Sequence, residues 1–124
     1  MKTLMPAMAL LSMMVFAPAA LADKASATKE VTKASAMIRS AEHGGADSMA
    51  TADLKMARDL LNSAQLSLED RDWQDAEYAA SKSQSDAEVA NAKTQALKAE
   101  QALAELQTVV DTLKDELKRQ GASR

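Results

Sequence analysis

The chain has 124 residues, and 15 Lys and Arg residues against 18 Asp and Glu residues give it a net charge of −3. This charge argues against nucleic acid as a partner, because nucleic-acid binding needs a basic surface that neutralises phosphates. The chain has no Cys, which excludes disulfide bonds, thiol nucleophiles and thiolate metal ligands.

The first 22 residues have the three zones of a secretory signal peptide. Lys2 is followed by an apolar stretch from Leu4 to Phe16, and the zone closes on Ala20-Leu21-Ala22, a motif of the A-x-A cleavage type. The apolar stretch is shorter than the roughly 20 residues that cross a bilayer. No Cys follows it that could carry a lipid. We therefore expect cleavage after Ala22, and a protein that begins at Asp23 and is soluble in the periplasm without a transmembrane segment.

Residues 23–124 form the expected helical domain. They are rich in Ala, Leu, Lys, Glu, Asp, Gln and Ser, and they lack the alternation of β-branched and aromatic residues that marks strands. We expect an all-α fold, an elongated helical hairpin or coiled coil with a long C-terminal helix. A core of alanines buries little apolar area per residue, but it lets two helix axes approach closely. Such a core suits thin helical hairpins.

The first predicted helix covers residues 28–43, after a frayed segment 23–27. Apolar residues recur at steps of three and four and make one stripe, which consists of Ala27, Val31, Ala34, Ile38 and Ala41. Gly44-Gly45 is expected to end this helix, because glycine readily takes the left-handed conformation of a helix C-terminus.

The second predicted helix covers residues 48–69, with Asp47 or Ser48 as its N-cap. Its apolar seam has heptad spacing and consists of Leu54, Ala57, Leu61, Ala64 and Leu68. A short charged turn follows, after which Asp72 caps the next helix and Asp75 complements its positive end. A turn this short places the two helices antiparallel to one another.

The third predicted helix covers residues 73–119, because no breaker occurs before Gly121. At 1.5 Å per residue it is about 70 Å long, against about 33 Å for the second helix, so half of it extends beyond its neighbour. Its seam changes phase near residue 90. The first part of the seam consists of Ala76, Ala80, Ser83, Ala87 and Ala90, and the second part of Ala92, Ala96, Ala99, Leu103, Leu106, Val110, Leu113 and Leu117.

Two interpretations of this phase change stay open. One is loose patterning in an alanine-rich sequence. The other is a rotation of the buried face by about 100°, the angle between successive helical residues, that accompanies a change of partner. On the second interpretation residues 76–90 pack on the second helix. Residues 103–117 then pack on another chain, or on nothing that this chain supplies.

The pattern of residues across 37–102 is similar to that of a known family. Its positions are Gly45-Ala46, Leu54, Ala57, Leu61, Ala64, Asp72-Trp73, Ala76, Ala80, Asp86-Ala87 and Ala90. This pattern resembles a bacterial envelope family of alanine-rich helical hairpins, domain of unknown function (DUF) 4398. In that family the turn usually reads Gly-Asp-Tyr-x-x-Ala, and here Arg71 replaces the glycine and Trp73 the tyrosine.

The resemblance implies a role in the cell envelope and no established activity. Members are often lipoproteins, or precede an OmpA-like peptidoglycan-binding domain. This sequence contains neither a lipoprotein Cys nor such a domain, so the wall or membrane tether of those members does not carry over to it. Proximity to the outer membrane or to peptidoglycan is implied by the resemblance alone.

No group of residues in this sequence predicts catalysis. His43 is the sole histidine, and we expect it to close the first helix, where a positive side chain is favourable. A zinc site would need three or four converging ligands. The carboxylates near the turn match no known cation-binding loop; they are Glu69, Asp70, Asp72 and Asp75. No Ser has a base to activate it. We expect no enzyme activity, no cofactor and no metal.

The hairpin turn, Asp72 and Trp73, is the other singular feature of the sequence. Trp73 is the only tryptophan of the chain. We expect it to pack against Leu66 and Leu68 and to close the end of the hairpin. The alternative is an exposed anchor for a partner, because tryptophan is enriched at the centres of protein interfaces.

The leading hypothesis is a non-catalytic structural or interaction protein of the periplasm that acts through helix–helix contacts. The interaction seam is expected on the third helix, and its knobs are Leu103, Leu106, Val110, Leu113 and Leu117. The partner is a second copy of the chain or a helical envelope protein. With Val110 at an a position and Leu106 and Leu113 at d positions, the pattern favours a parallel pair. The alternative function is amphipathic lipid or client binding, as in chaperones, which a wide apolar face with basic flanks would favour.

Overall fold

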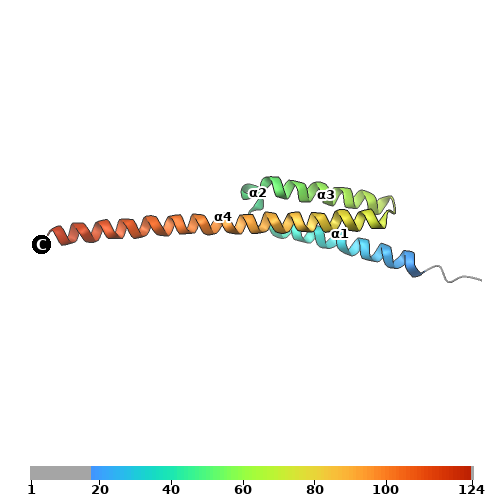
Figure 1. Ribbon diagram of the computed structural model, residues 1–124, viewed down its shortest axis with the longest axis horizontal. Helices are drawn as coiled ribbons and strands as arrows, with labels where there is room; N and C mark the ends of the chain where they lie inside the picture. Colours follow the sequence, from blue (N-terminus) through green and yellow to red (C-terminus); the bar gives the residue numbers. More distant parts are fainter. Residues whose placement is uncertain (1–17, 124) are drawn as a thin grey trace, which may run out of the picture.

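A computed structural model describes residues 18–123 of the chain, with side chains from residue 23 onward. It contains α1 (Pro18–Gly44), α2 (Ala46–Met49), α3 (Thr51–Glu69) and α4 (Trp73–Ala122). Helices α1 and α3 lie along the first half of α4, and the second half of α4 projects alone (Figure 1). The part of the chain that the structure describes contains no strand, so the all-α prediction is confirmed. Residues 1–17, most of the predicted signal peptide, lie outside the described residues.

Alanine dominates the core of this three-helix bundle. Ala34 of α1, Ala64 of α3 and Ala80 of α4 are each fully buried, and Leu54 is the largest fully buried side chain. Small side chains let the helix axes approach closely. The stripes predicted for the first two helices and the first part of the seam predicted for the third are confirmed, since all of their members are buried except the partly buried Leu61 and Leu68.

The position of α1 was not predicted from the sequence. Its stripe packs into the same clusters as α3 and α4, with Val31 and Ala34 beside Ala64 and Ala80. The Gln84 amide of α4 donates to the Glu30 carbonyl oxygen at 3.2 Å and to its carboxylate at 2.8 Å. The predicted hairpin of two helices is therefore one part of a three-helix bundle.

The predicted start of the first helix at residue 28, after a frayed segment, is wrong. Helix α1 begins at Pro18 and continues to Gly44. Ala27, which we expected in the frayed segment, is fully buried, and the Thr28 hydroxyl donates to the Lys24 carbonyl at 2.8 Å.

The predicted second helix is divided into α2 and α3, and its predicted N-cap is wrong. Ala50 interrupts the helix with φ −136° and ψ 43°, and this change of direction lets both Ala46 and Ala50 enter the core. The N-caps are Gly45 for α2 and Ala50 for α3, and neither makes a side-chain capping hydrogen bond. Asp47 instead accepts a hydrogen bond from Arg58.

Charged side chains link the helices at this corner. The Arg58 guanidinium of α3 donates to Glu42 at 2.6 Å and to Asp47 at 2.7 Å. These hydrogen bonds, that to Asp47 foremost, raise the pKa of Arg58 above its ordinary value. Arg58 therefore stays charged at all ordinary pH values, but its side chain is 45% exposed, so these ion pairs contribute little to stability. Lys93 of α4 donates to Asp53 of α3 at 2.7 Å.

The turn between α3 and α4 is a Schellman motif. The Asp72 N–H donates to the Ser67 carbonyl at 2.8 Å, and the Arg71 N–H donates to the Leu68 carbonyl at 3.2 Å. Arg71 has φ 62°, in the left-handed region. The Asp72 side chain then accepts from the Asp75 N–H at 3.3 Å, which confirms Asp72 as the N-cap of α4.

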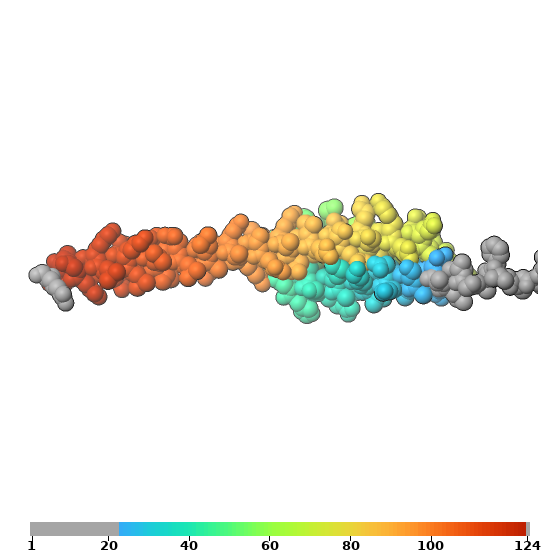
Figure 2. Space-filling model, turned by 60° about the horizontal axis from the view of Figure 1, so that its bottom comes forward, coloured from blue at the N-terminus to red at the C-terminus, as the bar shows by residue number. Residues whose placement is uncertain are grey.

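Helix α4 continues to Ala122, beyond the predicted end at residue 119, and includes Gly121. Its buried face follows the predicted first seam and ends at Thr94. Every described residue from 95 onward is exposed. The space-filling view shows this half as one bare helix that extends from the bundle (Figure 2).

The two seams of α4 lie on nearly opposite faces of the helix. The buried seam passes through residues 87, 90 and 94, whereas the second seam passes through residues 89, 92 and 96, which are exposed. The offset is two residues, or about 200°, and not the one residue and about 100° expected from the sequence. The second seam therefore points away from α1 and α3.

Candidate interaction surface

The predicted interaction residues form one exposed apolar line on the free half of α4, residues 95–122. We call Leu103, Leu106, Val110, Leu113 and Leu117 the leucine seam. Leu103, Leu106 and Leu117 are 67%, 63% and 68% exposed. Burial of a Leu or Val side chain contributes about 1.5–3 kcal/mol. Burial of five such side chains against a partner would therefore contribute a large favourable free energy to binding.

The exposed apolar surface of the free half of α4 is wider than the five-residue seam predicted from the sequence. Val109, beside the leucine seam, is 54% exposed, and Leu97 is also exposed. Toward the bundle, Val89 continues the line on the face of α4 that α1 and α3 leave uncovered. A helical-wheel assignment places Val109 at a g position, next to the a and d positions of the seam, and this signal was available in the sequence.

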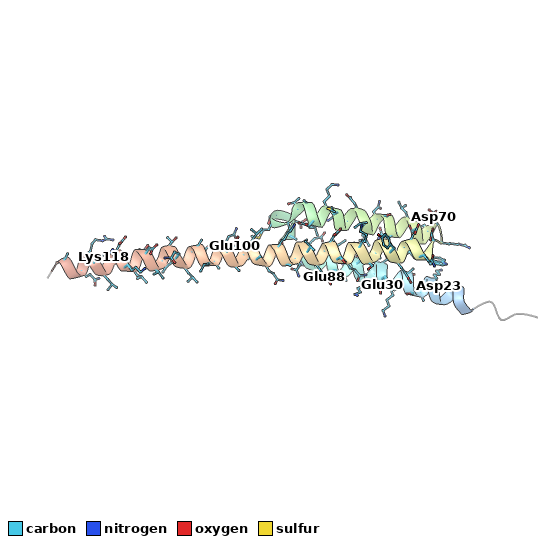
Figure 3. All side chains as sticks on the ribbon, viewed as in Figure 1. Asp23, Glu30, Asp70, Glu88, Glu100 and Lys118 are labelled. Carbon is cyan, nitrogen blue, oxygen red and sulfur yellow. The ribbon has the colours of Figure 1, made fainter. Side chains whose placement is uncertain are left out.

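Charges of both signs flank the leucine seam. Figure 3 shows Glu100 and Lys118 among the side chains that stand out from the free half of α4. Within the helix, the Lys114 Nζ lies 3.7 Å from the Asp111 Oδ1, and the Lys118 Nζ lies 3.7 Å from the Asp115 Oδ1. These pairs are well exposed, so each contributes little to stability.

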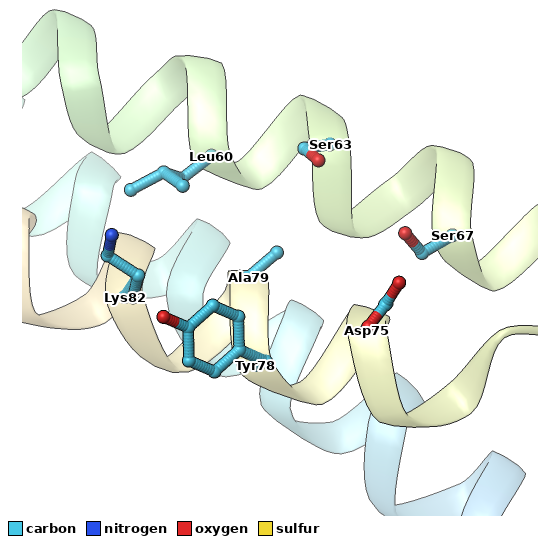
Figure 4. A pocket seen from close by; sticks show the side chains of 7 residues that line it. All are labelled: Leu60, Ser63, Ser67, Asp75, Tyr78, Ala79 and Lys82. Carbon is cyan, nitrogen blue, oxygen red and sulfur yellow. The ribbon is translucent and has the colours of Figure 1, made fainter.

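The bundle also carries a shallow groove between α3 and α4, of about 330 Å³. Leu60, Ser63 and Ser67 line it from α3, and Asp75, Tyr78, Ala79 and Lys82 line it from α4 (Figure 4). The Lys82 ammonium lies 5.9 Å from the centre of the Tyr78 ring, in the range of a cation–π contact.

The polar groups of this groove do not form a catalytic set. Ser67 and Asp75 point toward one another across the groove (Figure 4). The backbone N–H of Asp75 donates to Asp72, so this residue takes part in the helix cap. A nucleophilic serine needs a base within hydrogen-bond reach and a third group that orients the base. No hydrogen bond joins Ser63 or Ser67 to such a base among the described residues.

Trp73 at the hairpin turn has neighbours from α1 as well as from α4. Trp73 is half-buried and lines a hollow of about 120 Å³ with Asp23 of α1 and with Gln74 and Glu77. Leu66, its predicted neighbour, is 53% exposed. The neighbour from α1 results from the packing of α1, which was not foreseen and which brings Asp23 to the start of α4.

The remaining candidate residues are placed as helix-end groups. His43 lies exposed in the last turn of α1. Within residues 18–123, no three His, Cys, Asp or Glu side chains are close enough together to hold a metal ion. In the same part of the chain, no helix is both long enough and apolar enough to cross a membrane.

Comparison with known proteins identifies a family. No curated protein and no solved structure matches the chain significantly. One family model does match, over residues 29–106 and hence over more than half of the chain, and its description is "Domain of unknown function (DUF4398)". The match covers most of α1, all of α2 and α3, and α4 as far as Leu106. The chain therefore belongs to the DUF4398 family.

Proposed function

We propose that this protein is a non-catalytic structural or interaction protein of the cell envelope, and that it binds other helices through the leucine seam of α4. The observation that carries the proposal is the exposure of this seam along the free half of α4, where α1, α2 and α3 supply no cover. The envelope location is supported by the signal-peptide pattern of residues 1–22.

The spacing of the seam supports a helix as the partner. Apolar residues alternate at three and four residues from Leu103 to Leu117, which is the repeat of knobs-into-holes packing. Glu100 and Lys114, which have opposite charges, both flank it. A lipid-binding helix would instead present a wide apolar face with basic flanks.

The test is the association state of the protein with and without the seam. We expect the protein, purified from cells that express the full chain, to associate at tens of micromolar in light scattering. The double substitution Leu106→Asp and Leu113→Asp is expected to abolish association, because each aspartate places a charge in the contact face. The bundle stays folded, since neither residue contacts it.

A matched control uses the opposite face of the same segment. Gln101→Asp and Thr108→Asp have the same spacing of seven residues and also add two negative charges, but they lie away from the seam. This variant is expected to associate like the unchanged protein. The proposal fails if the unchanged protein is monomeric and retains no helical protein from an envelope extract, or if both double variants behave alike.

A further inference from the structure

The geometry of α4 points to a specific occupant of the leucine seam: we propose that it is the seam of a second copy, in antiparallel orientation and centred near residue 108. In this pair, residues 96–120 of the two chains overlap. The inference rests on the proposed function, because it names the partner of the same surface. It replaces the parallel pair that the identity of the a and d residues favoured.

The positions beside the seam distinguish the two orientations. In the heptad abcdefg, Leu103 and Val110 occupy a positions, and Leu106 occupies a d position. Parallel helices bring g positions of one chain against e positions of the other, whereas antiparallel helices pair e with e and g with g. Glu100 and Lys114 are both at e positions.

Charge complementarity favours the antiparallel pair. Glu100 of each copy lies opposite Lys114 of the other, which makes two ion pairs across the interface. In a parallel pair Glu100 would face Gln95 and Lys114 would face Val109, so no opposite charges would meet. Charged side chains at these flanking positions set partner choice and orientation in coiled coils.

Val109 gives an independent argument. It is an apolar residue at a g position and is 54% exposed in the single chain. In the antiparallel pair it meets Val109 of the second copy at the two-fold axis, where both side chains lose water. In a parallel pair the same side chain would lie against the charged Lys114. Only the antiparallel orientation pairs this residue with an apolar one at the facing flank position.

The sizes of the facing seam residues also match in the antiparallel pair. Ala99 lies opposite Leu117, and Leu103 opposite Leu113. Small residues facing large ones interdigitate and fill the interface. A parallel pair would instead place Ala99 against Ala99 of the second copy, and such a layer buries little apolar area.

Charge also selects the register. A shift of one heptad toward the bundle would bring Lys114 opposite Lys93 of the second copy, which already pairs with Asp53. A shift of one heptad in the other direction would leave Glu100 opposite Gly121. The centred register alone pairs both flanking charges with opposite ones.

The bundle leaves room for this arrangement. The buried side chains of α4 end at Thr94, on the face opposite the leucine seam, and the free half extends from residue 95 to residue 122. In the centred register Gln120 of the second copy reaches Ala96. The overlap therefore uses the length of free helix that the chain provides, and the two bundles lie at opposite ends of the dimer.

Disulfide cross-linking tests the orientation cleanly, because the chain has no cysteine. The protein, purified from cells that express the full chain, carries either Ala99→Cys or Leu117→Cys. In the antiparallel pair identical cysteines are about 27 Å apart along the helix, far beyond disulfide reach. We expect neither variant to cross-link alone under mild oxidation, and an equilibrated mixture of the two to form a mixed disulfide dimer.

A matched control pair, Gln101→Cys and Asp115→Cys, lies at a similar height on the outer face of the helix. The mixture of these two variants is expected to give no disulfide dimer, because their side chains point away from the second copy. Efficient cross-linking of Ala99→Cys to itself would overturn the antiparallel orientation.

Charge reversal tests the register by a second route. Glu100→Lys alone and Lys114→Glu alone each place like charges across the interface twice. We expect each to weaken dimerisation on the order of tenfold at low salt, and the double swap Glu100→Lys/Lys114→Glu to restore it to within about twofold. Equal affinities for all four proteins would overturn the proposed register.

The two proposals fail in different ways. If the unchanged protein is monomeric, a second copy is not its partner and the antiparallel inference fails. If it also retains no helical protein from an envelope extract, the proposed function fails as well. The antiparallel inference alone is overturned by a different pair of results. In that case association still requires Leu106 and Leu113, but the Ala99→Cys variant forms a disulfide with a second copy of itself.

Discussion

The backbone of Arg71 adopts a conformation that suits glycine. With φ 62° it provides the left-handed residue of the Schellman motif that ends α3. A left-handed residue with a Cβ atom costs roughly 1–2 kcal/mol relative to the right-handed form. The family's usual turn has glycine at this position, so this chain keeps the turn at an energetic cost.

Replacement of Arg71 by glycine is expected to stabilise the bundle. Relief of the left-handed strain exceeds the greater freedom that glycine gives to the unfolded chain, so the free energy of unfolding rises by about 0.5–1 kcal/mol. Urea unfolding followed by circular dichroism measures this change. Arg71→Ala keeps the Cβ atom and is expected to give no such gain. Equal stabilities for the two variants would show that the backbone conformation is not the cause.

The hydroxyl group of Ser83 makes a buried hydrogen bond that joins α4 to α3. Its Oγ donates to the Ala57 carbonyl at 2.7 Å, and Ser83 is fully buried. We expect Ser83→Ala to lower the free energy of unfolding by about 1 kcal/mol, the usual net value of such a bond. Ser85→Ala removes an exposed hydroxyl two residues away and is expected to change stability by less than about 0.5 kcal/mol. A Ser83→Ala variant as stable as Ser85→Ala would refute the assigned role.

At the scale of the element, α4 is one continuous helix with two different environments. Residues 76–94 contribute a buried face to the bundle, whereas every residue from 95 to 122 is exposed. A helix without tertiary contacts is only marginally stable in water. On the proposed function, the partner that covers the leucine seam also stabilises the free half.

Hydrogen exchange is expected to separate the two halves of α4. In the Leu106→Asp/Leu113→Asp variant, amides of residues 98–119 exchange orders of magnitude faster than those of residues 76–94, because they open without unfolding the bundle. In the unchanged protein, protection of residues 98–119 rises with protein concentration as the seam becomes covered. Protection that is uniform along α4 and independent of concentration would contradict this description.

At the scale of the whole molecule, the predicted cleavage site falls within α1. Residues 18–22 are helical, but the first buried side chain of α1 among those described is Ala27. A chain that begins at Asp23 therefore keeps every buried side chain of α1 that the structure describes. Export and folding of the bundle are compatible on this basis.

We expect the exported protein to begin at Asp23, as determined by N-terminal sequencing. Signal peptidases require small residues at the positions one and three before the cut, which are Ala22 and Ala20. An Ala22→Arg substitution is accordingly expected to accumulate the uncleaved chain. Recovery of the unchanged protein from the membrane fraction with an intact Met1 would contradict the predicted cleavage.

The sequence alone determined the helical class, the seams and the capping of α4. The reason is that these features are local. They follow from helix-forming residues without breakers, from apolar residues spaced at three and four, and from an Asp whose side chain accepts a hydrogen bond from the N–H three residues later. The buried stripe from Ala27 to Ala41 and the exposed seam from Leu103 to Leu117 both follow from such spacing. Family membership also followed from a pattern of alanines around the Asp72-Trp73 turn.

Only the tertiary structure decided which helices share a core and where the helices before α4 begin. The packing of α1 on α3 and α4 depends on contacts between residues far apart in the chain, such as Gln84 with Glu30, which no local pattern encodes. The same packing buries Ala27, moves Trp73 next to Asp23 and interrupts the helix at Ala50. It also determines that the leucine seam lies on the face of α4 opposite the bundle, because burial of one face leaves the other free for a partner.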